Sequence, residues 1–458
     1  MDANKHFENE LEVIISKTVD KAQLGTLVSH RYGTQSSISC LAPYVKSRED
    51  IEVLLRNRDS LEADQPIELC GISLHRILRR VVSLEDELGI ANSADSYVEF
   101  TKAHPMLVSF PPETAWLARK SATNAMRDCI ADTAQTLHRD WSEEQSLELG
   151  LKIQGLAIQH RKSYGFWKAI MKEVHDGNVL SRHIIEWTIA VANRARAKYL
   201  AGMTPVIDSR TPGSLSLSDR FNRAYLRARA ESSRSALMPH YLYTVNLSPF
   251  AIRRDKWTDF LAKLLRITRA ELATGEFDGI HLSIRNLKSI SRSVARVRTA
   301  KLLVSRLADV ARDFRVPMYW SRGYVAGLVG MDEGVTVSSF PLNLNTDDMF
   351  LDGGPQGEDA EEFHYGSVLN LWKKESLRME QIKASARSLP DLGAGLTSPT
   401  IEQLESSTAY RIGFSKPYNL RCLCALSKQW QKHILNNDVR PGKEYVQSFE
   451  LPWCNWGV

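Results

Sequence analysis

The sequence predicts an α/β protein built on a (β/α)8-barrel-like set of parallel strands, with a helical insertion and a C-terminal extension. Three observations lead to this prediction. Short apolar runs rich in β-branched and aromatic residues recur along the chain. Segments with helical periodicity separate them, and the repeat of about 35–40 residues is typical of β/α units. An open doubly wound sheet with a helical domain is the alternative architecture.

The strands are clearest in the middle of the chain, where turn residues bound each run. Five strands are expected there: Pro205–Ser209, His240–Asn246, Gly279–Arg285, Pro317–Ser321 and Gly334–Phe340. Three weaker candidates precede them: Leu24–Ser29, Ile67–Ser73 and Met106–Phe110. Together they make eight, the number that closes a barrel. Helices are expected at 218–233, 254–272 and 294–314, where apolar residues recur every three to four positions.

The chain divides into five predicted regions by composition. They are N-terminal β/α units (1–112), a helical insertion (113–202), central β/α units (203–345), an acidic mobile loop (346–362), and a C-terminal helix with a docked tail (363–458). No Lys or Arg occurs from Gly323 to Trp372, and the loop is rich in Gly and carboxylates. The last helix is expected at about 361–388, and the aromatic end of the tail predicts docking on the body.

Composition narrows the class of protein. The chain has 458 residues, of which 43% are hydrophobic and 25% charged, as in packed globular proteins. The net charge of +5 is small for this length, so overall charge implies no polyanionic partner. Six scattered cysteines fit free thiols in a reducing compartment. With a polar N-terminus and no apolar run long enough to span a membrane, the expected location is cytoplasmic, with no membrane partner.

The candidate site lies where the parallel strands end, because loops gather there and ligands bind there. Four predicted strands finish with a Ser and an Arg close together, and Arg with Ser suits phosphate or carboxylate oxygens. The predicted substrate-binding residues are Arg31, Arg210, Asn246, Ser283, Arg285, Asn286, Ser321, Arg322 and Ser339. The expected ligand is a phosphorylated or otherwise anionic molecule. The alternative is that some of these arginines point outward or pair with acids.

Asp208 and His30 are the candidate catalytic residues. Asp208 ends an apolar strand beside the predicted cations, and His30 ends another, so either could transfer protons. The alternative role of Asp208 is to cap the turn at Thr211-Pro212-Gly213. His281 and His240 fall within or at the start of strands and are interpreted as packing residues.

A second hypothesis is a non-catalytic subunit that binds nucleic acid or a nucleotide within a multiprotein complex. The segments 218–234 and 286–306 are rich in Arg and Lys and could lie along a phosphate backbone. The alternative is that they are solvated outer helix faces. The helical insertion is the expected surface for a protein partner.

Metal motifs are weak. Cys422 and Cys424 with His433 depart from the usual zinc spacings, so no metal is assigned, and the cofactor is left unknown. The serine-hydrolase, P-loop and zincin motifs are absent from the sequence, which argues against those classes.

Overall fold

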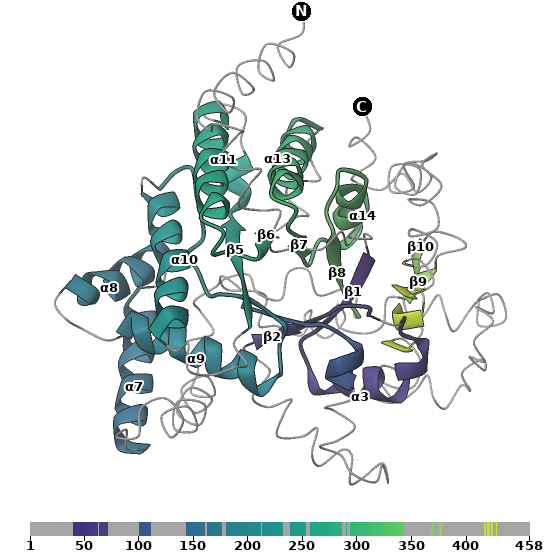
Figure 1. Cartoon of the computed structure of the whole chain (residues 1–458), viewed down its shortest axis with the longest axis horizontal. Helices are drawn as coiled ribbons and strands as arrows, with labels where there is room; N and C mark the ends of the chain where they lie inside the picture. The colour runs from purple at the N-terminus through teal and green to yellow at the C-terminus, as the bar shows by residue number, and fades with distance from the viewer. Residues whose placement is uncertain are drawn as a thin grey trace, which may run out of the picture.

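The computed structural model shows a closed barrel of parallel strands in chain order (Figure 1). The barrel strands are β1 (Cys40–Val45), β2 (Ile67–Cys70), β3 (Met106–Ser109), β4 (Tyr199–Ala201), β5 (His240–Leu247), β6 (Gly279–Ile284), β7 (Met318–Ser321) and β8 (Val337–Pro341). β1 pairs with β8, from Cys40 opposite Val337 to Tyr44 opposite Pro341. This pairing confirms the predicted barrel and excludes an open doubly wound sheet, whose edge strands would be unpaired.

The structure describes most of the barrel and the helices around it. The described residues are 40–62, 64–71, 100–110, 143–160, 163–175, 180–211, 213–231, 239–252, 257–285, 290, 294–342, 368–370, 375–377, 416, 417, 419–421, 423, 424 and 427. The predicted strand 24–29 and the acidic loop 346–362 lie outside them. None of the described helices is long and apolar enough to cross a membrane.

Helices cover the outside of the barrel. They are α3 (Arg48–Arg56), α7 (Glu143–Gln159), α8 (Ser163–His175), α9 (Leu180–Arg194), α10 (Ser214–Glu231), α11 (Trp257–Ala273), α13 (Val294–Asp313) and α14 (Tyr324–Asp332), with short 3-10 turns η1 (Arg58–Ser60) and η3 (Pro249–Ile252). In Figure 1, α11, α13 and α14 lie side by side along β5 to β8. Helices α7, α8 and α9 follow β3, within the predicted helical insertion.

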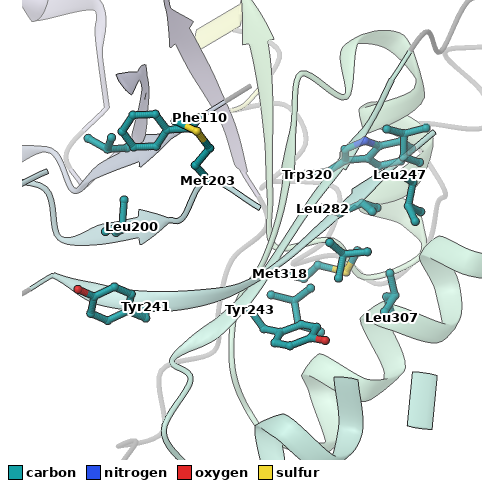
Figure 2. Packing of buried hydrophobic residues seen from close by; sticks show 14 of the residues in the cluster. Phe110, Leu200, Met203, Tyr241, Tyr243, Leu247, Leu282, Leu307, Met318 and Trp320 are labelled. Carbon is teal, nitrogen blue, oxygen red and sulfur yellow. The ribbon is translucent and has the colours of Figure 1, made fainter. Parts of the chain in front are cut away.

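Outward-facing strand residues and the inner faces of the helices form the main core. Leu282 of β6 and Met318 of β7 face Leu307 of α13, and all three are buried (Figure 2). On the opposite side of the barrel, the ring of Phe110 after β3 lies 5.4 Å from the ring of Trp187 on α9. This alternation of outward apolar residues places every second strand residue inside the barrel.

Two of the barrel strands differ from those predicted. The predicted strand Pro205–Ser209 is wrong, because the fourth strand is the short β4 and only Ile207 forms an isolated bridge, to Leu247. Pro205 has no amide hydrogen to donate to a ladder. The side chain of Asn222 on α10 instead bonds both the amide and the carbonyl of Thr244, beyond the end of β4.

The first barrel strand, β1, was not predicted because Pro43 interrupts its sequence, and proline is unusual inside a strand. In the structure, side chains from other parts of the chain form hydrogen bonds with the backbone just before this proline. The amide of Leu41 donates to Ser427 Oγ at 3.2 Å, and its carbonyl accepts from Gln65 Nε2 at 2.8 Å. Register pairing between β1 and β2 begins at Tyr44, after the proline.

Helical residues between 416 and 427 lie against β1 and the end of β8. Asn419 Nδ2 donates to the carbonyl of Leu342 at 2.8 Å, just after β8. Lys416 Nζ lies 2.6 Å from Asp50 Oδ1 in the first turn of α3. With the bond from Leu41 to Ser427, these contacts place a segment from late in the chain where the eighth helix of a barrel belongs, between the last strand and the first.

The predicted helix at 361–388 is wrong at the residues the structure describes there. Val368–Asn370 (β9) and Glu375–Leu377 (β10) pair antiparallel instead. Helical periodicity is a weak guide over so short a segment, because pairing between two backbones overrides local propensity.

Gly327 on α14 supports the first stability prediction. A Cβ at this position would overlap Ser338 Oγ on β8. The helix can therefore lie this close to the strand only because residue 327 has no side chain. We expect Gly327→Ala to lower the free energy of unfolding by about 1–3 kcal/mol, as overpacking does, although alanine favours a helix. Urea unfolding measures the effect.

The matched control is Gly155→Ala on α7, where an added Cβ meets no atom within 4 Å. This variant should gain about 0.5–1 kcal/mol from helix propensity alone. Ser338→Ala in the Gly327→Ala background should recover part of the loss. Similar unfolding midpoints for the two glycine variants would show that α14 does not need its close approach to β8.

Candidate functional site

The interior of the barrel is polar in its C-terminal half. Its buried polar side chains are Glu68, Ser109, Thr244, Asn246, His281, Ser283, Ser321 and Ser339. Below them, at the N-terminal end, small and apolar residues fill the barrel, including Ala42, Leu107 and Leu242. A packed barrel is usually filled by bulky branched side chains, so a carboxylate and an imidazole in this position call for an explanation.

Glu68 on β2 is the centre of this group. Its Oε1 accepts hydrogen bonds from the hydroxyls of Ser109 on β3 and Ser321 on β7. It also lies 3.9 Å from Nε2 of His281 on β6. Since β1 and β8 stand between β2 and β7 in the sheet, the bond to Ser321 crosses the inside of the barrel.

The Glu68 carboxyl is 2% exposed, yet it favours the ionised form. Burial alone raises the pKa of Glu68, because it disfavours the charge. The interaction with His281 and the hydroxyl donors Ser109 and Ser321 outweigh burial and hold the pKa below its ordinary value. The site therefore contains an ionised carboxylate enclosed by protein.

Two buried polar side chains of the barrel interior are incompletely satisfied. Neither ring nitrogen of His281 has a hydrogen-bond partner among the described residues, and the same holds for Oδ1 of Asn246. Nδ2 of Asn246 donates to Thr204 Oγ1 at 2.9 Å, which fixes the orientation of the amide. Such groups are uncommon in native structures, and here they face the polar interior where a ligand or water could bond them.

Arg322 directly follows β7 and bonds residues of β6 and β8 at the C-terminal end of the barrel. Its amide donates to Ser339 Oγ at 2.7 Å, and Nη2 donates to Ser283 Oγ at 3.1 Å. Its Cζ lies 6.0 Å from the centre of the Tyr44 ring. The backbone has φ of 53°, a left-handed conformation that costs a non-glycine residue about 1–2 kcal/mol. This conformation aims a guanidinium over the polar interior.

Tyr44 completes the group from β1. It is buried, and burial raises its pKa well above the ordinary value; Cys70 raises it further, whereas Arg322 opposes the rise. The phenol therefore remains protonated and can donate a hydrogen bond. Glu68, His281, Tyr44 and Arg322 thus combine an ionised carboxylate, an imidazole, a neutral phenol and a cation at one end of the barrel.

Several predicted binding residues meet at this end. Ser283, Ser321, Arg322 and Ser339 contact one another or Glu68, and Asn246 lies opposite Ser283 in the register of β5 and β6. Arg285 is half-buried, and its amide donates to the carbonyl of Leu247 at 2.9 Å. The predicted residues His30, Arg31 and Asn286 lie outside the described residues.

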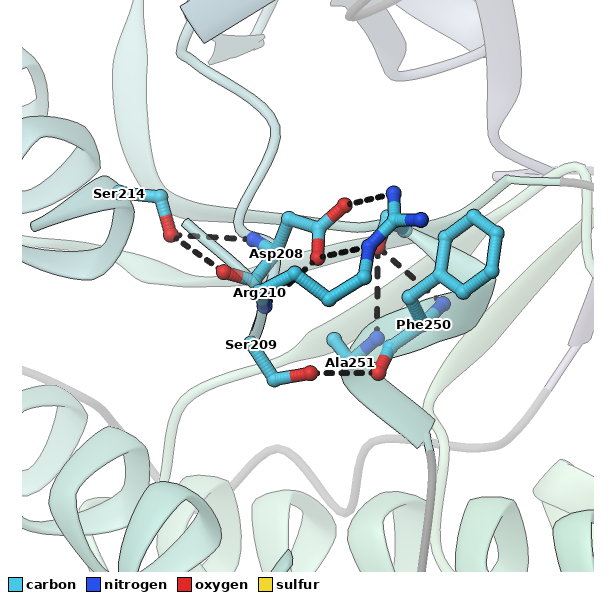
Figure 3. A network of polar contacts seen from close by, with 7 residues as sticks. Asp208, Ser209, Arg210, Ser214, Phe250 and Ala251 are labelled. Atoms are coloured by element: carbon cyan, nitrogen blue, oxygen red, sulfur yellow. Dashed lines mark hydrogen bonds and ion pairs between the residues drawn. The ribbon is translucent and has the colours of Figure 1, made fainter. Parts of the chain in front are cut away.

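Asp208 and Arg210 form a separate arrangement in the turn between β4 and α10 (Figure 3). Arg210 donates to both carboxylate oxygens of Asp208, at 3.1 and 2.7 Å, and its Cζ lies 3.2 Å from the centre of the Phe250 ring. Asp208 also accepts from the amide of Arg210 at 2.9 Å, as a turn-capping residue does. Burial raises the pKa of Asp208, but the bonds from Arg210 lower it more.

The guanidinium of Arg210 is therefore directed to Asp208 and Phe250, and its side chain is 54% exposed. This differs from the predicted convergence of arginines at one rim, in which Arg210 and Arg322 share a ligand. The difference arises because Asp208, two residues before Arg210 in the same turn, forms an ion pair with its guanidinium.

Glu68, His281 and Tyr44 were not predicted. Glu68 lies in the short run Ile67-Glu68-Leu69, and His281 lies between Ile280 and Leu282. The sequence signal for Glu68 and His281 is an ionisable residue between apolar neighbours in a strand. Such a residue indicates that one face of the strand meets polar groups. His281 was interpreted as a packing residue; it is buried, and the alternation of β6 turns it inward, 3.9 Å from Glu68.

The metal hypothesis gains no support from the part of the chain that the structure describes. No group of three or more His, Cys, Asp or Glu residues there is arranged to hold a metal ion. Sγ of the buried Cys424 lies 3.6 Å from Gln65 Oε1. Cys422 and His433 are not among the described residues.

Comparisons with known proteins add no family. No protein-family model matches the chain, and no curated protein shows significant similarity to it.

Proposed function

We propose that the protein is an enzyme that binds a phosphorylated or otherwise anionic small molecule at the C-terminal end of the barrel. In this proposal Arg322 binds the anionic group, and Glu68 accepts a proton from the substrate. His281 and the phenol of Tyr44 supply the other hydrogen-bonding groups around the reacting atoms.

The observation that carries the proposal is the buried, ionised Glu68. Two hydroxyls donate to its carboxylate, the His281 imidazole lies 3.9 Å from it, and together these groups outweigh the cost of burying the charge. A titratable group with a perturbed pKa in a polar enclosure is a typical feature of active sites. At neutral pH Glu68 is in the proton-accepting form that a general base requires, and its lowered pKa makes it a weaker base than an ordinary glutamate.

Arg322 supports an anionic ligand. The guanidinium donates to the Ser283 hydroxyl, the Arg322 amide donates to the Ser339 hydroxyl, and Arg presents a planar set of donors that matches phosphate or carboxylate. Its strained backbone is a further sign of a functional position. The identity of the ligand beyond this charge is open to the test below.

The alternative, a nucleic-acid-binding subunit, receives less support. Several basic residues of α10 and α13 pair with acids of the same protein, which lowers the surplus charge on these faces. The pairs are Arg223 with Asp219 and Glu271, Lys301 with Glu333, and Arg306 with Asp309. A steep fall of duplex-DNA affinity with rising salt would favour this alternative.

The test is thermal unfolding with glycerol 3-phosphate, inorganic phosphate and pyrophosphate, each against glycerol or chloride at equal ionic strength. At about 100 times its dissociation constant, a ligand stabilises the native state by about 2.7 kcal/mol. We expect the phosphate compounds to raise the melting temperature of the wild type by a few degrees. Arg322→Met should abolish this increase.

Arg210→Met is the matched control, because it removes an exposed arginine that is already paired with Asp208. It should retain the full stabilisation by phosphate compounds. An equal loss in both variants would contradict the assignment of Arg322. The absence of any stabilisation of the wild type by the three anions would contradict the proposal of a phosphate ligand.

A further inference from the structure

Lys46 stands at the same end of the barrel, directly after β1. The inward-facing residues of β1 are Cys40, Ala42 and Tyr44, so Lys46 is the next residue in the inward register. Its amide donates to Asp50 Oδ2 at 3.0 Å, which fixes the turn from β1 into α3. Lys46 is partly exposed as a residue, in contrast to the buried Lys416.

The groups that face Lys46 come from each element packed around it. They are Asp50 of α3, Lys416 of the 416–427 segment, Cys70 of β2 and Arg322 after β7. Asp50 already pairs with Lys416, with 2.6 Å between Oδ1 and Nζ. One carboxylate therefore faces two lysines, and Lys46 competes for it with the buried Lys416.

Burial lowers the pKa of Lys46 to about 8, and the nearby charges of Lys416 and Arg322 act in the same direction. Asp50 and Cys70 oppose the shift. At pH 7.5, roughly a quarter of such amines are neutral, against roughly a thousandth of an ordinary lysine. Neighbouring cations and burial are two common ways in which proteins activate a lysine as a nucleophile.

We propose that Lys46 is an amine nucleophile that forms an imine with a carbonyl compound bearing a phosphate or carboxylate group. The amine nitrogen bonds to the carbonyl carbon, the carbonyl oxygen takes the two amine protons, and it leaves as water. The product is a carbon–nitrogen double bond, and no oxidant or reductant is consumed. The inference rests on the proposed function, since Arg322 would hold the anionic group of the same substrate.

The experiment traps the imine on the intact wild-type chain. The protein is incubated at pH 7.5 with glycolaldehyde phosphate, glyoxylate or neutral glycolaldehyde, reduced with cyanoborohydride, and mapped by peptide mass spectrometry. We expect Lys46 to be labelled at least about tenfold faster than the exposed Lys198, which is the internal control. Its labelling rate should rise with pH and level off just above 8.

The two anionic probes should label Lys46 faster than neutral glycolaldehyde does. Arg322→Met should remove this preference, and because the charge of Arg322 helps to lower the pKa of Lys46, it should also slow labelling by neutral glycolaldehyde at pH 7.5. Equal labelling of Lys46 and Lys198 by all three probes would overturn the inference, even if phosphate still stabilises the protein and the proposed function stands. Fast labelling of Lys46 without preference for the anionic probes would support the reactive amine and overturn the anionic substrate.

Discussion

Glu68→Met should lower the free energy of unfolding by about 3 kcal/mol, because it leaves two buried hydroxyl donors without their acceptor. Ser109 and Ser321 both donate to Oε1 of Glu68, and both are buried. His281 also loses its charged neighbour. Urea unfolding at pH 7 measures the loss, with Glu148→Met on the exposed face of α7 as the control, where about 0.5 kcal/mol or less is expected.

Glu68→Gln separates the charge from the packing. Since the folded-state pKa of Glu68 is lowered, its ionisation contributes stability above the unfolded pKa of a glutamate, and this contribution is lost as the pH falls through the folded pKa. Wild type should therefore lose stability on acidification in that window, and Glu68→Gln should lose less. Parallel pH profiles for the two proteins would contradict an ionised Glu68 in the native state.

The helix and strand pattern of the second half of the barrel could be predicted from sequence. The strands β5 to β8 are apolar runs bounded by turn residues, and α13 begins at Val294 as its periodicity indicates. β1 and β4 could not be predicted in the same way. A proline interrupts β1, and β4 has only three residues, so neither carries a recognisable pattern of alternation.

The candidate site could be predicted only in part, for a geometric reason. Residues at the carboxyl ends of parallel strands converge in any barrel, which brought Ser283, Arg322 and Ser339 together as expected. A contact across the interior depends on strand register and on the inward alternation of strands far apart in sequence. Glu68 and Ser321 are separated by 253 positions, and no local pattern around either one indicates the other.

The same alternation explains how stability and the candidate chemistry coexist in one sheet. Outward residues such as Leu282 and Met318 pack against the helices, whereas inward residues such as His281 and Ser321 are polar. The main core of the protein therefore lies outside the barrel. The interior can hold charged groups whose burial costs free energy, because the outer layer supplies the packing.

Lys416→Met should be among the most destabilising single changes in the protein, at about 3–5 kcal/mol, because it removes the ion-pair partner of a buried carboxylate. Asp50 is 1% exposed and Lys416 is 4% exposed. Asp50 also accepts the amides of Lys46 and Ser47, at 3.0 and 2.9 Å, so it cannot turn to solvent without opening the first turn of α3. The matched control is Lys301→Met, whose partly exposed pair with Glu333 should contribute about 0–1 kcal/mol.

The pH dependence distinguishes this pair from simple packing. Burial raises the pKa of Asp50, but Lys416 and the amide donors lower it by more, so the folded carboxyl is ionised. The stability that this charge contributes is lost as the pH falls through the folded pKa. Removing Lys416 removes the strongest of these opposing effects, and the variant should lose less stability on acidification than the wild type. Equal urea midpoints for Lys416→Met and Lys301→Met would show that the 416–427 segment does not hold β1 and α3 in place. The barrel would then close without help from the 416–427 segment.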